Sequence, residues 1–265
     1  MSSNRWHEAK AFVRHYIRSK GPHGVHSPFV YRLITHVLRQ RLNYSLYEAI
    51  EKERRNLMRS NDLLEVQDYG AGSRVQRGNQ RMVKEIARNA LQSSSNAKAL
   101  AILAEHSRAK CILELGTSLG ITTAHLAAAL PHAKVFTIEG CPNVAAQAKA
   151  VWGRLGIDTI DLTVGSFSEV LENVLKRMPS VDFVIIDGDH RGSACREYLE
   201  AILPFTHNNT VVILDDIYWS PSMTEAWQTI IKDKRFSLTL DFFDFGVLYQ
   251  TPGRVKEHFE LKRAW

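Results

Sequence analysis

Residues 111–120 read CILELGTSLG, and this stretch decides the fold of the chain. An apolar run ends in Glu114, a turn containing Gly116 and Gly120 follows, and residues 121–130 are rich in Ala and Leu at helical spacing. The order predicts a strand, a tight turn and a helix. Glycines let a ligand approach the main chain, and the first turn of a helix offers unpaired N–H groups to an anionic group.

A second apolar stretch, residues 134–138, ends in Glu139. This acidic residue lies about 20 residues beyond the turn, where nucleotide-binding folds hold a ribose hydroxyl. A glycine turn alone also occurs for purely structural reasons, and a carboxylate alone can simply be solvated. The agreement of position and residue type favours a nucleotide-type site at the carboxyl ends of two strands.

The sequence Glu114-Leu-Gly116-Thr117-x-x-Gly120-x-Thr122 resembles the first motif of class I S-adenosylmethionine-dependent methyltransferases. It is most similar to the catechol-type O-methyltransferase branch, although Ser118 stands where the general pattern has Gly. The resemblance extends over about residues 97–250, judged by motif order. It implies that S-adenosylmethionine is bound by Glu114, Gly116, Thr117, Ser118, Gly120, Thr122, Glu139, Gly165, Ser166, Phe167 and Asp187. Phe167 is placed to wall the adenine, with simple core packing as the alternative.

From residue 110 onward, strand and helix patterns alternate, which is typical of a parallel sheet. The predicted strands are residues 111–115, 134–138, 161–164, 183–186, 210–214, 237–242 and 247–250. A short turn separates the last two, so they form an antiparallel hairpin. We therefore expect a Rossmann-like, doubly wound α/β sheet that is mostly parallel. Residues 1–96 are expected to form a helical extension, and residues 97–265 the S-adenosylmethionine-binding methyltransferase domain.

Acidic residues follow two of these strands. Asp187 ends the run VDFVIID, and Asp215 and Asp216 end TVVILDD. Carboxylates at the ends of neighbouring strands repel one another unless they are neutralised, and oxygen ligands suit Mg²⁺, Ca²⁺ or Mn²⁺. We therefore expect Asp187, Asp215 and Asp216 to hold a divalent cation. The alternative is that one Asp caps a helix while another is exposed.

The resemblance implies the same metal site, because metal-dependent O-methyltransferases carry acidic residues at these positions. In that branch a Lys often acts as base where this chain has His190. Histidine titrates near neutrality and can take a proton from a hydroxyl, so His190 and Asp187 are the predicted catalytic residues. The run Asp-Gly-Asp-His also occurs in macrocin-type sugar O-methyltransferases, so phenol and sugar hydroxyls are both open as acceptors. Tyr218 and Trp219 either line the acceptor pocket or pack in the core.

Basic and acidic residues are unevenly distributed along the chain. Residues 1–110 contain 20 Lys and Arg against 9 Asp and Glu, whereas residues 111–265 contain 14 against 19. A basic half can attract nucleic acid, anionic lipid or an acidic substrate, or it can be a solvated helical surface. Residues 5–19 predict a basic amphipathic helix with Trp6, Val13 and Tyr16 on one face. Such a helix can lie on a membrane surface. We expect instead that its apolar face packs on its own domain or on a second subunit, and the second case gives a homodimer through the N-terminal helices.

Other features narrow the partners and the compartment. His23 and His26 lie in a Gly/Pro loop without a nearby carboxylate, which disfavours a metal site there. Residues 68–79 are expected to form a loop, with a lid as its role. Three separated cysteines, no apolar run of membrane-spanning length and no signal-peptide pattern favour the cytoplasm.

The expected function is a metal-assisted, S-adenosylmethionine-dependent O-methyltransferase acting on a small hydroxylated acceptor. One alternative keeps the cofactor but makes RNA or protein the acceptor, and the lack of an N-P-P-[YF] motif disfavours it. The other is a non-enzymatic binding module on a relic fold, which the intact set of acidic and glycine residues disfavours.

Overall fold

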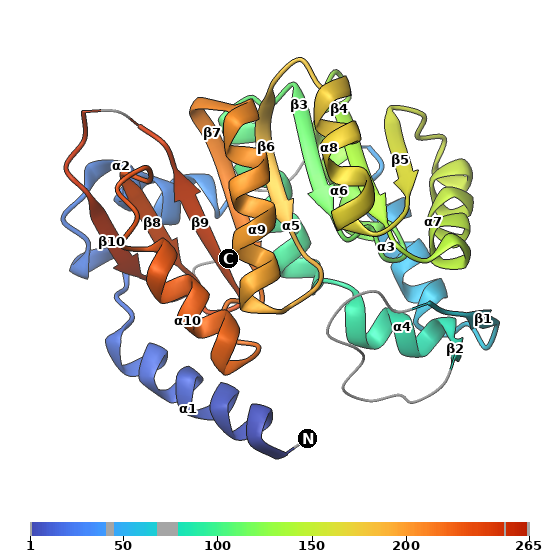
Figure 1. The fold of residues 1–265 in the computed structure, drawn as a ribbon, viewed down its shortest axis with the longest axis horizontal. Helices are drawn as coiled ribbons and strands as arrows, with labels where there is room; N and C mark the ends of the chain where they lie inside the picture. Colours follow the sequence, from blue (N-terminus) through green and yellow to red (C-terminus); the bar gives the residue numbers. More distant parts are fainter. Residues whose placement is uncertain (1, 41–44, 68–78, 252, 264–265) are drawn as a thin grey trace. The chain divides into compact units, whose positions relative to one another are not determined.

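The computed structural model of the protein describes residues 2–40, 45–67, 79–251 and 253–263. The chain packs as two compact units (Figure 1). The first unit consists of Met1–Gln40 and Ser180–Trp265, and the second unit is Arg41–Pro179. The predicted domain boundary after residue 96 divides the chain by its motifs instead, and it stays a prediction.

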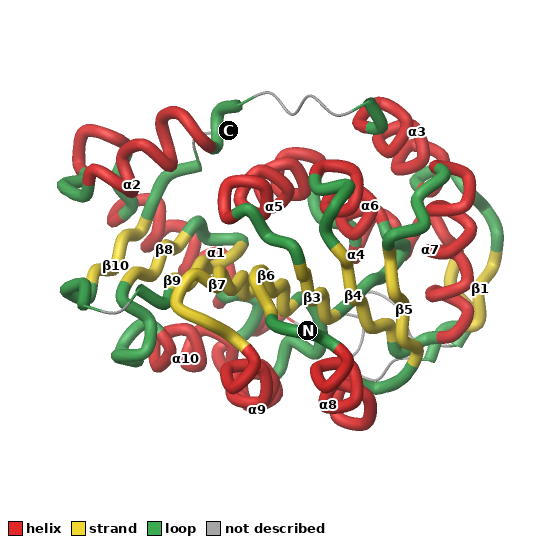
Figure 2. The backbone as a smooth tube through the Cα atoms, turned by 90° about the horizontal axis from the view of Figure 1, so that it is seen from above, coloured by secondary structure: helices red, strands yellow, loops and turns green. Residues whose placement is uncertain are grey.

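The second unit contains three parallel strands in the order β3-β4-β5. They are β3 (Cys111–Leu115), β4 (Lys134–Glu139) and β5 (Ile160–Val164). The connections are α6 (Ile121–Ala129), α7 (Pro142–Leu155) and α8 (Phe167–Arg177). Every residue of β3 is buried, as expected for a strand covered on both faces. Figure 2 shows α6 and α8 on opposite faces of these strands, the doubly wound arrangement.

The first unit contains five strands in the order β10-β8-β9-β7-β6. They are β6 (Val181–Ile186), β7 (Thr206–Asp215), β8 (Leu238–Asp241), β9 (Phe245–Tyr249) and β10 (Glu257–Glu260). Strand β9 is antiparallel to both β7 and β8, so the predicted hairpin is confirmed. The prediction missed β10, which pairs parallel with β8. The strands within each unit follow the mostly parallel arrangement of a Rossmann-like fold, as predicted.

Helices cover both faces of the strands in the first unit. Figure 2 shows α9 and α10 on one face and α2 on the other. Their bounds are Pro28–Arg32 for α2, which continues as a π-helix over Leu33–Val37, Gly192–Ile202 for α9 and Pro221–Ile230 for α10. Short 3-10 helices lie at Pro22–Gly24 and Leu203–Phe205.

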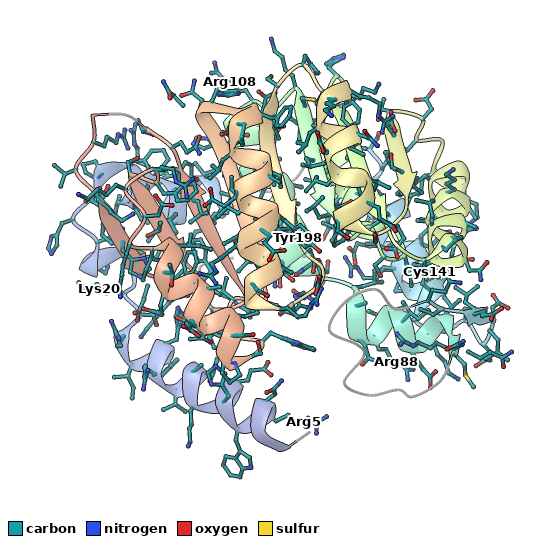
Figure 3. All side chains as sticks on the ribbon, in the orientation of Figure 1. Arg5, Lys20, Arg88, Arg108, Cys141 and Tyr198 are labelled. Atoms are coloured by element: carbon teal, nitrogen blue, oxygen red, sulfur yellow. The ribbon has the colours of Figure 1, made fainter. Side chains whose placement is uncertain are left out.

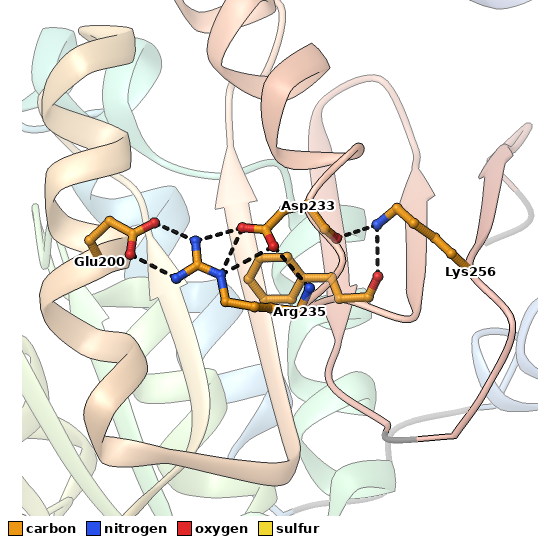
Figure 4. A network of polar contacts seen from close by, with 5 residues as sticks. Glu200, Asp233, Arg235 and Lys256 are labelled. Carbon is orange, nitrogen blue, oxygen red and sulfur yellow. Dashed lines mark hydrogen bonds and ion pairs between the residues drawn. The ribbon is translucent and has the colours of Figure 1, made fainter.

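A charged network holds the loop between α10 and β8 (Figure 4). Arg235 bonds both oxygens of Glu200 on α9 and also pairs with Asp233 in its own loop. Lys256, just before β10, donates to the carbonyl oxygens of Asp233 and Phe236. The Arg235 side chain therefore ties the end of the helical layer to the loop that leads into the last strands.

The N-terminal region differs from the predicted all-helical extension in one place. Strand β2 (Gln80–Met82) pairs antiparallel with β1 (Leu63–Glu65) before α4 (Val83–Ala90) begins. Three residues are too few to show a strand periodicity, and the partner strand is distant in sequence. The predicted lid loop lies outside the described residues except for Asn79.

Two helices of this region pack into the second unit. Helix α3 (Tyr47–Leu57) buries Ile50 and Leu57 in a hydrophobic cluster with residues of α6 and α7. Its Glu51 lies 3.0 Å from His125 Nε2 and accepts from Arg54. Burial opposes ionisation, but the bonds to His125 and Arg54 lower the pKa of Glu51 to about 2. Helix α5 is Ser94–Ser107, capped by the Ser93 side chain.

Helix α1 (Ser2–Arg18) packs on the first unit through a polar contact. His15 is buried, and its Nε2 lies 3.1 Å from Oδ1 of Asp241, which is fully buried. Asp241 Oδ2 also accepts from the Tyr218 hydroxyl at 2.6 Å and from Trp227 Nε1 at 2.8 Å. Burial lowers the pKa of His15, but the hydrogen bond to Asp241 and its charge raise it on balance. Trp6 and Val13 of the predicted apolar face are exposed in the single chain, and packing of this face on a second subunit stays a prediction.

None of the described helices combines the length and the apolar character that crossing a membrane requires.

Candidate active site

The glycine turn lies between β3 and α6 in the second unit. Gly116 and Gly120 have φ values of 101° and 77°, and Ser118 between them also has a positive φ of 48°. The Gly116 amide donates to the Ile138 carbonyl oxygen at 3.0 Å, which fixes the turn to β4. The predicted tight turn therefore has positive φ values at three positions.

Glu139, the last residue of β4, is tied to this turn. One carboxylate oxygen accepts from the Ser118 amide and the other from the Cys141 amide, both at 2.9 Å. The Glu139 carbonyl oxygen accepts from the Gly165 amide at 3.0 Å. The structure thus brings together three predicted cofactor residues, Ser118, Glu139 and Gly165, at the carboxyl ends of β3, β4 and β5.

Glu114 faces inward and is 1% exposed. Its Oε2 accepts from the Thr123 hydroxyl at 2.6 Å and from the Thr137 hydroxyl at 2.7 Å. Thr117, another predicted cofactor residue, is also buried, with its hydroxyl 2.6 Å from that of Thr137. Sequence reasoning missed Thr123 and Thr137, although a hydroxyl in the middle of the apolar strand 134–138 was the available signal. These contacts hold the base of the turn in place.

The remaining predicted cofactor residues of the second unit lie near the starts of helices. Thr122 is buried in the first turn of α6. Ser166 precedes α8 and bonds Glu169 at 2.5 Å, and Phe167, the first residue of α8, is half-buried. Trp152 on α7 was not predicted, and its Nε1 donates to the Gly120 carbonyl oxygen at 2.8 Å.

In the first unit, β6 delivers the run Asp187-Gly-Asp-His190. Asp189 in this loop has a positive φ of 50° and a 4% exposed side chain. Arg191 bonds both of its oxygens at 2.6 Å, and the Tyr198 hydroxyl donates at 2.9 Å. Burial and the bond to Asp189 raise the pKa of Tyr198 to about 12, so this phenol stays protonated. Asp189 therefore fixes the loop, with Tyr198 on α9 as its anchor (Figure 3).

His190, next in the same loop, faces the end of β7. Its Nε2 lies 3.7 Å from Asp216 Oδ2, a distance suited to an ion pair but too long for a hydrogen bond. The Trp219 ring lies 5.4 Å from the imidazole, centroid to centroid. Asp216 has a positive φ of 52°, and its amide donates to the Asp244 carbonyl oxygen. Strained residues that surrounding contacts hold in place cluster at functional sites, so these loops are candidates on backbone grounds also.

The carboxylates predicted to hold a metal ion lie in this unit. Asp187 and Asp215 follow the paired residues Ile186 and Leu214 of β6 and β7. Asp215 is buried at 5% exposure, whereas the Asp216 side chain is 37% exposed and faces His190. Within the part of the chain that the structure describes, no three His, Cys, Asp or Glu side chains form a group that could hold a metal ion. The three carboxylates therefore do not form a set of ligands around one point in the described structure, and the metal site stays a prediction.

The two aromatic residues after β7 separate in role. Tyr218 is buried and belongs to the cluster around Asp241, which is the core alternative. Trp219 is half-buried beside His190, which suits the wall of an acceptor site.

Comparison with known proteins shows what this chain is similar to. A family described as "Methyltransferase domain" matches residues 113–217, a segment that contains the glycine turn, Glu139, His190 and Asp216. A catechol O-methyltransferase of Niastella koreensis is 30% identical over 128 residues, covering 47% of this chain and 57% of that protein. The chain spans about half the length of the curated relatives it matches.

Solved structures share the fold. The O-methyltransferase TomG from Streptomyces achromogenes, in complex with S-adenosylmethionine, has a TM-score of 0.54 at 21% identity, over 62% of this chain and 82% of that one. A Podospora anserina methyltransferase bound to S-adenosylhomocysteine has a TM-score of 0.60 at 15% identity, over 86% and 97%. The predicted resemblance to class I methyltransferases of the catechol-type O-methyltransferase branch is confirmed.

Proposed function

We propose that the protein is an S-adenosylmethionine-dependent O-methyltransferase acting on a small hydroxylated acceptor. The observation that carries the proposal is the pair formed by His190 and Asp216, 3.7 Å apart at the ends of two adjacent parallel strands. A histidine beside a carboxylate is a suitable base for a hydroxyl, because the carboxylate stabilises the imidazolium that forms. The matched methyltransferase segment contains both residues.

The cofactor is assigned to the second unit. The left-handed turn leads into α6, whose first backbone amides have no partner within the helix, and the Glu139 carboxylate, held by the amides of Ser118 and Cys141, is assigned to the ribose hydroxyls. Gly165, Ser166 and Phe167 are assigned to the adenine side, and Asp187 of the first unit is the remaining residue that the resemblance implies for the cofactor. Glu114, Thr117 and Thr122 support the turn from below.

His190 is assigned as the base that takes the proton of the acceptor hydroxyl. When bound, S-adenosylmethionine supplies a methyl group on a positively charged sulfur, and an acceptor oxygen displaces that sulfur. Asp216 faces Nε2 of His190, so Nδ1 is the nitrogen that takes the hydroxyl proton, leaving a methyl ether and S-adenosylhomocysteine as products. Trp219 walls the acceptor beside the imidazole, and Asp189, locked by Arg191 and Tyr198, keeps the His190 loop in place.

The metal ion predicted from Asp187, Asp215 and Asp216 has no step in this scheme. Its support is the position of three carboxylates after two adjacent strands, and the arrangement of their side chains does not provide a ligand set. Activity in excess EDTA decides the matter: a loss that Mg²⁺ restores establishes the cation, whereas unchanged turnover leaves His190 as the base without it.

Turnover tests the function. The protein is incubated with S-adenosylmethionine and a panel of phenols and sugars, and S-adenosylhomocysteine formation is measured. Catechol is the first acceptor to try, because two relatives are named catechol O-methyltransferase. We expect acceptor-dependent product with at least one small hydroxylated compound. Methylation of RNA or protein alone would instead support the alternative acceptors, and cofactor binding without turnover would support a binding module.

A further inference from the structure

Helix α1 presents an apolar stripe to solvent. Trp6, Val13 and Ile17 are 69%, 57% and 76% exposed, and their spacing of seven and four residues places them on one face. Phe12 and Tyr16 lie beside this stripe and are also largely exposed. Five of the large hydrophobic side chains that are exposed in the described chain therefore belong to one helix.

The polar contacts of α1 fix this orientation. His7 Nε2 lies 2.8 Å from the Thr224 hydroxyl on α10, and His15 reaches the buried Asp241. At helical spacing His15 lies opposite Trp6 and Val13, and His7 lies between the two sides. Figure 1 shows α1 running beside α10 within the first unit. The stripe cannot turn inward without breaking the buried contact between His15 and Asp241.

The charges on the exposed side of α1 indicate which kind of partner this helix can bind. Four exposed basic residues flank the stripe, and they are Arg5, Lys10, Arg14 and Arg18. Glu8 is the single acidic residue of α1. Figure 3 shows Arg5 near the N-terminal end of the helix. Arg18 pairs with Glu260, and the other three have exposed heads beside the apolar stripe. A second copy would bring the same basic row against this one, so the charges favour an anionic partner.

We propose that α1 docks the protein on an anionic phospholipid surface. Trp6, Val13 and Ile17 enter the boundary between headgroups and acyl chains, and Arg5, Lys10 and Arg14 contact the phosphates. A helix with an apolar face, a basic polar face and an interfacial Trp binds in this way. Nucleic acid would satisfy the basic residues but would leave the Trp6, Val13 and Ile17 stripe in water, so lipid explains both features of the helix.

Vesicle co-sedimentation tests the proposal with the full chain. One set of vesicles is pure phosphatidylcholine, and the other contains phosphatidylglycerol in addition. We expect binding to the anionic vesicles that weakens as NaCl is raised. The double variant Trp6→Ser/Ile17→Ser should bind at least about tenfold more weakly, because it removes two membrane anchors. Val255→Ser is the matched control, since Val255 is 85% exposed but lies outside α1, and it should bind like the native protein.

Two further measurements keep the result decisive. Circular dichroism checks that each variant is folded, and the blue shift of tryptophan emission on adding anionic vesicles should disappear in Trp6→Phe, which keeps an aromatic anchor. Equal binding by the native protein and the double variant, or no binding to anionic vesicles, overturns the proposal. A dimer in sedimentation velocity that the double variant dissolves also overturns it in favour of a second copy, and salt-sensitive RNA binding without vesicle binding does so in favour of nucleic acid.

Discussion

Gly120 combines two constraints that can be separated by experiment. It has a positive φ of 77°, and a Cβ there would lie 2.7 Å from Trp152 Nε1. Gly156, at the end of α7, has a similar φ of 67° but no atom within 4 Å of an added Cβ. We expect Gly156→Ala to cost about 1 kcal/mol of unfolding free energy through backbone strain alone. Gly120→Ala should cost about 2–4 kcal/mol, because overpacking against Trp152 adds to the strain.

Urea denaturation of both variants measures this difference. Equal losses would show that the turn tolerates a Cβ and that Trp152 moves aside without cost.

His190 and Asp216 predict a pattern of rates. Removing a positioned base typically lowers the rate by about 10²–10⁴-fold, so His190→Ala should lower kcat in that range. Asp216→Asn should lower kcat less, because the imidazole remains while its counter-charge is lost. His207→Ala is the matched control, since His207 forms a similar pair with Asp182 at 2.7 Å near the opposite ends of the strands.

The pH dependence of kcat is the readout that a merely structural role would not move. The kcat of His190→Ala should depend less on pH than the kcat of the native enzyme, because the proton acceptor is missing. A native-like profile in His190→Ala would remove His190 from the chemistry.

At the level of single residues, the sequence predicted the turn well and its support poorly. The glycines at 116 and 120 and the acid at 139 follow from spacing, because a tight turn and a following strand restrict what can stand there. The sequence did not predict the partners of Glu114 and Asp189, because Thr137 and Tyr198 reach these carboxylates only in the folded arrangement of their side chains. The amino-acid sequence alone does not show which hydroxyl faces which carboxylate in the folded protein.

At the level of elements, the attachment of α1 should depend on pH. His15 has a raised pKa in the folded state, so its ionic contribution to stability is fully present below the unfolded pKa of about 6.5 and is lost as pH rises through the higher folded value. We expect His15→Ala to lower the unfolding free energy by about 1–3 kcal/mol, because it also removes a partner from the buried Asp241.

Thermal unfolding from pH 5 to pH 9 measures this gap, with exposed His132→Ala as the control. The gap between native protein and His15→Ala should narrow as pH rises. A gap that is constant across the range would mean that His15 contributes only neutral packing.

The elements themselves were predicted where periodicity is strong. Strand β3 has the predicted bounds, since a run of buried apolar residues followed by Gly permits little else. Strands β1 and β2 were missed because each has three residues, and β10 because it pairs at an edge with half-buried residues. The polar contact that holds α1 was not predicted, because its partner, Asp241, is 226 residues away from His15. Amphipathic pattern alone cannot foresee a polar contact of that kind.

At the level of the whole molecule, each of the two units contains one set of the residues proposed to function. The residues assigned to the ribose and adenine belong to the second unit, and the base and its carboxylate belong to the first. The sequence indicated the class of protein because both sets of residues follow strands in the expected order. The acceptor could not be predicted, because the residues that select it, such as Trp219, are identified only by their neighbours in space.

Calorimetric titration of the protein with S-adenosylmethionine and, separately, with NAD tests the assignment of the glycine turn. We predict a single site for S-adenosylmethionine, no comparable binding of NAD, and a loss of about 1–3 kcal/mol of binding free energy in Glu139→Ala through the missing charge-assisted hydrogen bonds. Preferred binding of NAD, or an affinity for S-adenosylmethionine that Glu139→Ala leaves unchanged, would contradict the assignment.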